Sequence, residues 1–79
     1  MNEHQVREII LSIVGRIAPE ADLTSIKPDC RFRDQFEFDS IDCLNLVTAI
    51  EKECGVQIRE AEYPGLATLN GCIRYLTAQ

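Results

Sequence analysis

The chain has 79 residues, of which 46% are apolar, so it is long enough for one domain with a modest hydrophobic core. Thirteen acidic residues against eight basic ones give a net charge of −5, which argues against nucleic-acid binding, because that needs clustered Lys and Arg. No apolar run approaches the roughly 18 residues that span a bilayer, and residues 1–5 lack the basic and apolar parts of a secretory signal. We therefore expect a cytoplasmic protein with no membrane span.

The four cysteines indicate neither a metal site nor disulfides. No two of them have Cys-x-x-Cys spacing, and the single histidine, His4, lies near the start of the chain. Nothing in the sequence marks secretion, and small thiols are common in cytosolic cores. We expect no bound metal, and reduced cysteines that pack as small apolar residues: Cys30, Cys43, Cys54 and Cys72.

An amphipathic helix is predicted at the start of the chain, where apolar residues recur at helical spacing until Pro19 ends the pattern. The apolar stripe consists of Val6, Ile9, Ile10, Ile13, Val14 and Ile17. The next stretch, residues 19–38, has no sustained period and is predicted to be a long loop. Four apolar residues are expected to anchor this loop to the core: Leu23, Ile26, Phe32 and Phe36.

A second helix is predicted to begin at Asp39–Ser40. Asp39 is a suitable N-cap, and Asp42 places a negative charge in the first turn, where it interacts favourably with the helix dipole. Gly55 fits the position that follows the last helical turn. The side facing the core is expected to consist of Leu46, Val47, Ile50 and Cys54.

Two further helices follow in the prediction. Residues 60–66 are expected to form one short turn of helix, which Pro64 limits. Thr68 can cap a last helix with an apolar face made of Leu69, Cys72, Ile73 and Leu76. No segment alternates with a period of two, so no strand is expected. The predicted fold is an all-α four-helix bundle with three longer helices and one short helix.

The segment Asp39-Ser40-Ile41-Asp42 carries the most specific signal, a serine between two carboxylates at a predicted helix start after a long loop. This resembles the acyl carrier protein family, whose signature is an Asp-Ser-Leu-Asp-like tetrapeptide that opens the second helix. The resemblance covers roughly residues 5–77, because the apolar positions on both sides of the motif fall in register without a gap. We accordingly expect residues 1–79 to form a single acyl carrier domain.

The resemblance implies a carrier that is not itself an enzyme. A phosphopantetheinyl transferase would attach 4′-phosphopantetheine from coenzyme A to Ser40, and Asp39 would support the reaction by helping to position the transferase's magnesium ion. The thiol of the arm would hold acyl intermediates as thioesters. The carrier would present them to partner enzymes of fatty-acid, polyketide or specialised lipid biosynthesis.

Charge placement and the resemblance together indicate where partners dock. The segment from Asp34 to Glu53 contains six acidic residues and one basic residue, a sum of −5, so we expect acyl-processing enzymes with basic docking patches. Four residues on the second helix are expected to contact partners: Ile41, Asp42, Leu44 and Thr48. We expect a monomer that binds no nucleic acid and has no membrane span.

Other functions remain open to different degrees. A catalytic Ser40 is disfavoured, because the only histidine, His4, begins another helix and no Gly-x-Ser-x-Gly motif is present. A peptidyl or aminoacyl carrier with the same fold is one alternative, although the residues before Ser40 disfavour it. An unmodified acidic helical adaptor is another.

Three residues depart from the pattern of fatty-acid carriers. Glu37 lies where Gly is frequent, Phe38 adds apolar bulk beside Ser40, and Asn45 replaces an acidic residue. These departures favour a carrier for a specialised pathway at least as strongly as a carrier for housekeeping fatty-acid synthesis. Because the chain starts at Met1 and ends just after the last predicted helix, we expect a free-standing carrier rather than a module of a megasynthase.

Overall fold

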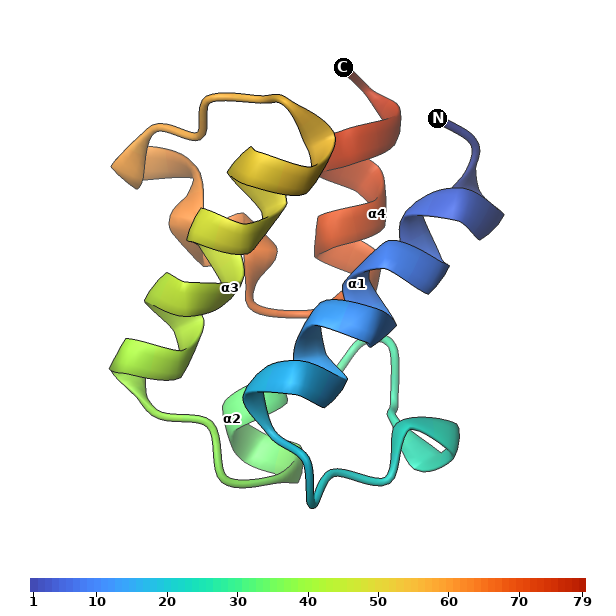
Figure 1. Ribbon diagram of the computed structural model, residues 1–79, viewed down its shortest axis with the longest axis vertical. Coiled ribbons are helices and arrows are strands. Elements are labelled where there is room, and N and C mark those ends of the chain that lie inside the picture. The colour runs from blue at the N-terminus through green and yellow to red at the C-terminus, as the bar shows by residue number, and fades with distance from the viewer.

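Three long helices frame the molecule in the computed structural model, which describes residues 1–79. They are α1 (Glu3–Ile17), α3 (Ser40–Cys54) and α4 (Leu69–Thr77). Helix α1 packs against both α3 and α4, and the two chain termini lie near each other at one end of the bundle (Figure 1). The start of α3 lies toward the other end (Figure 1). None of the helices is both long and apolar enough to cross a membrane.

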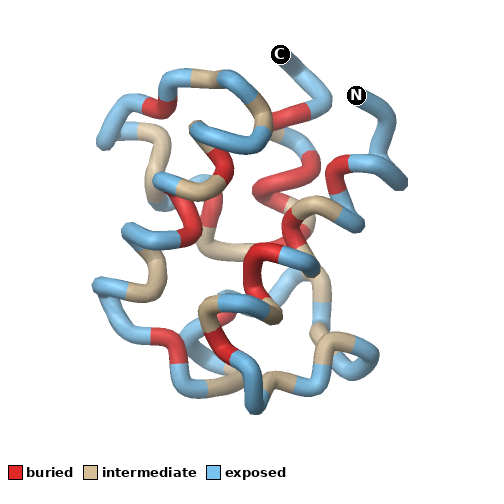
Figure 2. The backbone as a smooth tube through the Cα atoms, viewed as in Figure 1, coloured by how far each residue is buried: buried red, intermediate tan, exposed pale blue.

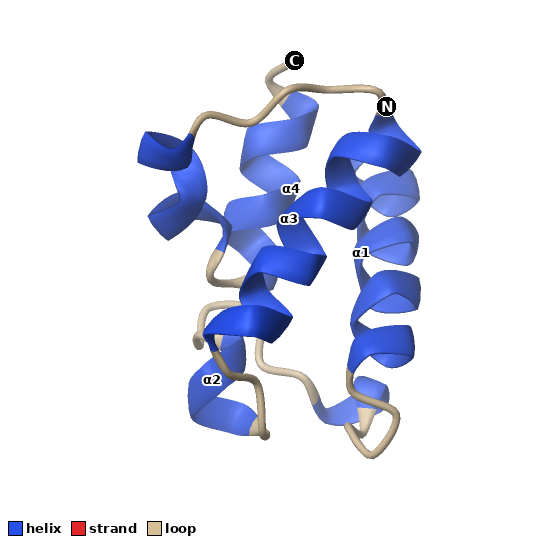
Figure 3. Ribbon diagram, turned by 60° about the vertical axis from the view of Figure 1, so that its left-hand side comes forward, coloured by secondary structure: helices blue, strands red, loops and turns tan.

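Three shorter helical segments connect the long helices. Two of them, η1 (Leu23–Ser25) and α2 (Phe32–Gln35), interrupt the stretch that was predicted to be a loop, and η2 (Glu60–Leu66) matches the predicted short helix. The four-residue α2 and three-residue η1 are too short to give a periodic signal in the sequence. No strand is present (Figure 3). The prediction of an all-α bundle with three longer helices and one short helix is confirmed.

The core is one cluster of 16 buried residues that line the space between the three long helices (Figure 2). Helix α1 buries Val6, Ile10, Ile13 and Val14, so most of its predicted stripe is confirmed. The predicted inward residues of α3 and α4 are buried as well, apart from half-buried Cys54 at the end of α3. Gly55 ends α3 in the left-handed conformation, with φ 66°, as predicted.

Specific hydrogen bonds fix the long connection between α1 and α3. The backbone N–H of Phe32 donates to the Ala67 carbonyl over 3.0 Å, and that of Asn70 donates to the Pro28 carbonyl over 3.0 Å. The Asn70 side chain also donates to Asp29 over 2.7 Å. These bonds join the connection to the junction of η2 and α4, so α2 is held in place beside the start of α3.

Helix α4 passes unusually close to η2 at Gly71. A Cβ atom on this residue would lie 2.0 Å from the Gly65 carbonyl oxygen and 2.9 Å from Thr68 Oγ1. Only glycine permits this approach. The contact sets how closely α4 packs on η2.

Candidate attachment site

The first turn of α3 is closed by a reciprocal pair of hydrogen bonds. The Asp42 backbone N–H donates to Asp39 Oδ1 over 2.9 Å, and the Asp39 backbone N–H donates to Asp42 Oδ2 over 3.1 Å. This capping box satisfies two backbone donors at the helix start. Ser40 is the first residue of the helix and is exposed. The predicted helix start and the capping role of Asp39 are confirmed.

Three aromatic rings pack beneath this helix start. Phe38 lies 5.6 Å from the ring centroids of both Phe32 and Phe36, and is only 4% exposed. The expectation that Phe38 adds bulk at the surface beside Ser40 is wrong. Residues 36–38 have the burial pattern of extended chain, with Glu37 exposed and Phe38 buried. Phe38 therefore supports the site from the core side.

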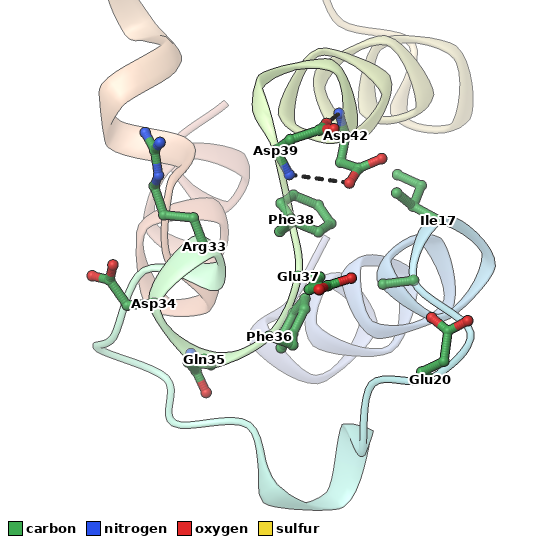
Figure 4. Close-up of a pocket in the computed structure, with 11 residues that line it drawn as sticks. Ile17, Glu20, Arg33, Asp34, Gln35, Phe36, Glu37, Phe38, Asp39 and Asp42 are labelled. Carbon is green, nitrogen blue, oxygen red and sulfur yellow. Dashed lines mark hydrogen bonds between the residues drawn. The ribbon is translucent and has the colours of Figure 1, made fainter.

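An open acidic hollow lies on one side of the site, with a volume of about 700 Å³ (Figure 4). Five carboxylates and one basic side chain line it; the acidic residues are Glu20, Asp34, Glu37, Asp39 and Asp42. Glu20 follows α1 and was not part of the predicted acidic stretch. No three acidic, Cys or His side chains in the molecule are arranged to hold a metal ion. The negative field of the hollow attracts cationic groups.

An apolar cavity of about 310 Å³ lies on another side of Ser40, between α3 and η2. Seven of its nine lining residues are apolar; the full set is Arg33, Ser40, Cys43, Leu44, Leu46, Val47, Tyr63, Leu66 and Ala67. This cavity cannot be predicted from the sequence alone, because its walls come from three separate segments. Only the tertiary fold brings them together.

Cys43 lies one turn after Ser40 and lines this cavity. The sequence predicts that Cys43 packs as a small apolar residue, and the structure places it half-buried in the cavity wall. Burial raises the pKa of the Cys43 thiol, as do the charges of Asp42 and Asp39, against a lowering influence of Arg33. The thiol is therefore protonated at neutral pH and is a weak nucleophile. All four cysteines are free thiols. Cys43, Cys54 and Cys72 pack at least partly against the core, but Cys30 is exposed, so the prediction that it packs as an apolar residue is wrong.

Arg33 lies on the boundary between the acidic hollow and the apolar cavity, since it lines both. It is the only basic residue that lines either one. Its neighbour Asp34 is bound by Arg31 over 2.8 Å, and Arg33 itself forms no ion pair. The one indication of this position in the sequence is that a basic residue comes directly before the acidic stretch.

The outer face of α3 is exposed and partly apolar. Ile41 is 69% and Leu44 is 52% exposed, and Thr48 is exposed on the same helix. With Met1, Ile41 and Leu44 are the large apolar residues that the fold leaves in solvent. The predicted separation of α3 into a core side and an exposed side is confirmed. Asp42 differs from the other three residues predicted to contact partners. Its carboxylate accepts the Asp39 N–H in the capping box, and the residue is only half-exposed.

Comparison with known proteins places the chain in a family. A family model described as "Phosphopantetheine attachment site" matches residues 4–76. The chain therefore belongs to the phosphopantetheine-binding family of carrier proteins, and it is a carrier rather than an enzyme. It is similar to "Polyketide-8 synthase acyl carrier protein 2" of Streptomyces avermitilis, with 27% identity over 79 residues. The match spans all of this chain and 85% of that protein.

The residues at the start of α3 fit the covalent 4′-phosphopantetheine group that defines the family. Ser40 is exposed, the apolar cavity begins beside it, and Arg33 offers an unpaired positive charge. When bound, the group supplies a terminal thiol that holds acyl groups as thioesters. The chain itself supplies a fixed helix start, an adjoining apolar cavity and a charged surface.

Proposed function

We propose that Ser40 carries the 4′-phosphopantetheine arm, and that Asp39 supports its attachment. Three observations favour Ser40: its exposure, its place as first residue of α3 and its position between two carboxylates. The other two serines are less suitable attachment sites. Ser25 donates its hydroxyl to Asp22 over 2.8 Å, and Ser12 lies on α1 without flanking acids.

Asp39 has a second role in this proposal. One of its oxygens accepts the Asp42 N–H, the other has no hydrogen-bond partner within the chain, and Asp39 lines the acidic hollow. A carboxylate oxygen is a suitable ligand for Mg²⁺, which keeps several waters and takes few protein ligands. Asp39 would thus help to position the metal that the transferase brings with its coenzyme A substrate.

The exposed face of α3 is the proposed docking surface, formed by Ile41, Asp42, Leu44 and Thr48. An apolar centre with acidic surroundings fits partners with a small apolar pocket inside a basic patch. The transferase and the acyl-processing enzymes would share this surface. Because they share it, the carrier would bind only one of these enzymes at a time.

The pathway we favour is polyketide or another specialised acyl pathway rather than housekeeping fatty-acid synthesis. Asn45 on α3 lacks the acidic group common in fatty-acid carriers, and the relative described above is a polyketide carrier. We expect low turnover when the loaded protein is the only carrier in a reconstituted fatty-acid elongation assay. Turnover equal to that of an ordinary fatty-acid carrier would contradict this assignment.

Intact-mass analysis after incubation with a broad-specificity transferase, coenzyme A and Mg²⁺ tests the attachment site. The wild-type protein should gain the mass of one phosphopantetheine group, and Ser40→Ala should gain none. Ser12→Ala and Ser25→Ala serve as matched controls and should load fully. A mass gain that persists in Ser40→Ala would refute the site, and no gain in any variant would refute the carrier function itself.

A further inference from the structure

Attachment of the arm creates an electrostatic problem at Ser40, and the following inference rests on the proposed function. The phosphodiester adds one negative charge directly to the Ser40 oxygen. Asp39 and Asp42 flank that residue, and the acidic hollow with three further carboxylates begins beside it. A new anion there is repelled by all of them unless a cation lies close by. The helix N-terminus contributes only a partial positive charge.

Arg33 is the one cation placed to compensate this charge. It shares the wall of the apolar cavity with Ser40, and no other basic side chain lines the cavity or the hollow. Figure 4 shows the Arg33 side chain directed away from the carboxylate of its neighbour Asp34. That carboxylate is already paired with Arg31. The guanidinium of Arg33 is therefore free to take a new anionic partner.

The influence of Arg33 reaches the first turn of α3. Its positive charge lowers the pKa of Cys43, although burial outweighs it. Cys43 lies three residues after Ser40 on the same helix, so the two side chains are neighbours on one face. The guanidinium thus acts on the side of α3 that carries both Ser40 and Cys43.

We propose that Arg33 binds the phosphodiester of the arm on Ser40 and directs the arm along the apolar cavity, away from the acidic hollow. A guanidinium suits this role better than an ammonium group, because its planar donors can bind two phosphate oxygens at once. Arg33 is a positioning residue in this proposal. It touches the prosthetic group but takes no part in acyl transfer.

A comparison of apo and holo forms tests the proposal. Arg33→Gln removes the charge. Arg7→Gln is the matched control, since Arg7 is an exposed arginine in the first half of α1 and forms no ion pair. Each protein is prepared unmodified and fully loaded, with loading verified by intact mass. The first readout is the change in melting temperature on loading. The second is the 31P NMR resonance of the phosphodiester.

Loading should lower the melting temperature of Arg33→Gln by about 2 to 5 °C more than that of the wild type. This is the change in melting temperature expected when a small domain loses one exposed charge pair. The control should match the wild type. High salt should shrink the difference. The 31P resonance should move in Arg33→Gln and stay in place in Arg7→Gln.

An equal effect of loading on all three proteins, or a 31P resonance unmoved by Arg33→Gln, would overturn the proposal. Both results require protein that carries the arm, so they leave the carrier function standing. Failure of the wild type to load at Ser40 would instead refute the carrier function, and the mass spectrum reveals this before either readout is taken.

Discussion

Asp39 and Asp42 bind each other's backbone: each carboxylate accepts the N–H of the other residue, over 2.9 and 3.1 Å. The pair therefore holds the first turn of α3 whether or not Ser40 is modified. It also gives Asp39 two separable roles, as a hydrogen-bond acceptor for the helix and as a negative charge beside Ser40, the proposed attachment site. A substitution that changes one role and keeps the other can distinguish them.

Asp39→Asn should keep the cap and lose the charge. Asparagine accepts the same backbone N–H, so we expect little change in the free energy of unfolding, whereas Asp39→Ala should cost about 1 kcal/mol. Both variants should be loaded more slowly by the transferase, because both lack the carboxylate proposed to help position its metal. Urea unfolding and loading rates measure the two effects. Wild-type loading of Asp39→Asn would show that the charge is dispensable.

The docking proposal predicts a loss of partner binding without a loss of stability. Ile41→Ala and Leu44→Ala remove side chains that are mostly exposed, so unfolding free energies should stay within about 0.5 kcal/mol of the wild type. The apparent Michaelis constant of the transferase for the carrier should rise. Leu46→Ala on the buried side of α3 is the contrasting case and should cost about 2 to 5 kcal/mol of stability. Unchanged kinetics in both exposed variants would place docking elsewhere.

Gly71→Ala should destabilise the protein severely. The new Cβ would lie 2.0 Å from the Gly65 carbonyl oxygen, so α4 and η2 would have to separate. We expect a cost of about 1 to 3 kcal/mol, as for other overpacked sites. Gly65→Ala is the control on the facing segment, because no atom lies within 4 Å of its Cβ position. Thermal unfolding of both variants checks the prediction, and equal melting temperatures would contradict it.

The buried thiol of Cys72 should make the protein less stable at alkaline pH. Burial raises the pKa of Cys72 from 9.0 to about 12. The unfolded chain therefore loses this proton before the folded protein does, and stability falls as the pH rises from about 9 to about 12. Cys72→Ala should flatten the fall in unfolding free energy between about pH 7 and about pH 10.5, measured with urea. An identical slope in both proteins would contradict the assignment of this pH dependence to Cys72.

The sequence was most informative where a local rule fixes the structure. The stripe from Val6 to Ile17 predicts α1, and the pattern Asp39-Ser40-Ile41-Asp42 predicts both the cap and the helix start. Gly55 predicts the end of α3 for the same reason, since its left-handed φ depends on one residue type. These features need no knowledge of the rest of the chain.

Features that depend on distant segments could not be predicted in this way. The apolar cavity requires Tyr63 of η2 to face the first turns of α3, and the acidic hollow requires Glu20 to lie opposite Asp39. The inward orientation of Phe38 depends on its contacts with Phe32 and Phe36. For the hollow and for Phe38, the long connection between α1 and α3 decides the result, and hydrogen bonds to the η2–α4 junction set its course. The cavity depends mainly on where η2 packs against α3.

The neighbouring termini have a practical consequence for experiments on this protein. Both ends of the chain lie at one end of the bundle, and Ser40 begins α3 toward the other (Figure 1). A surface tether, a fluorescent label or a fused enzyme can therefore be joined at either terminus while Ser40, the proposed attachment site, still faces solvent. Immobilised carrier of this kind could be loaded, offered to one enzyme after another and washed between steps.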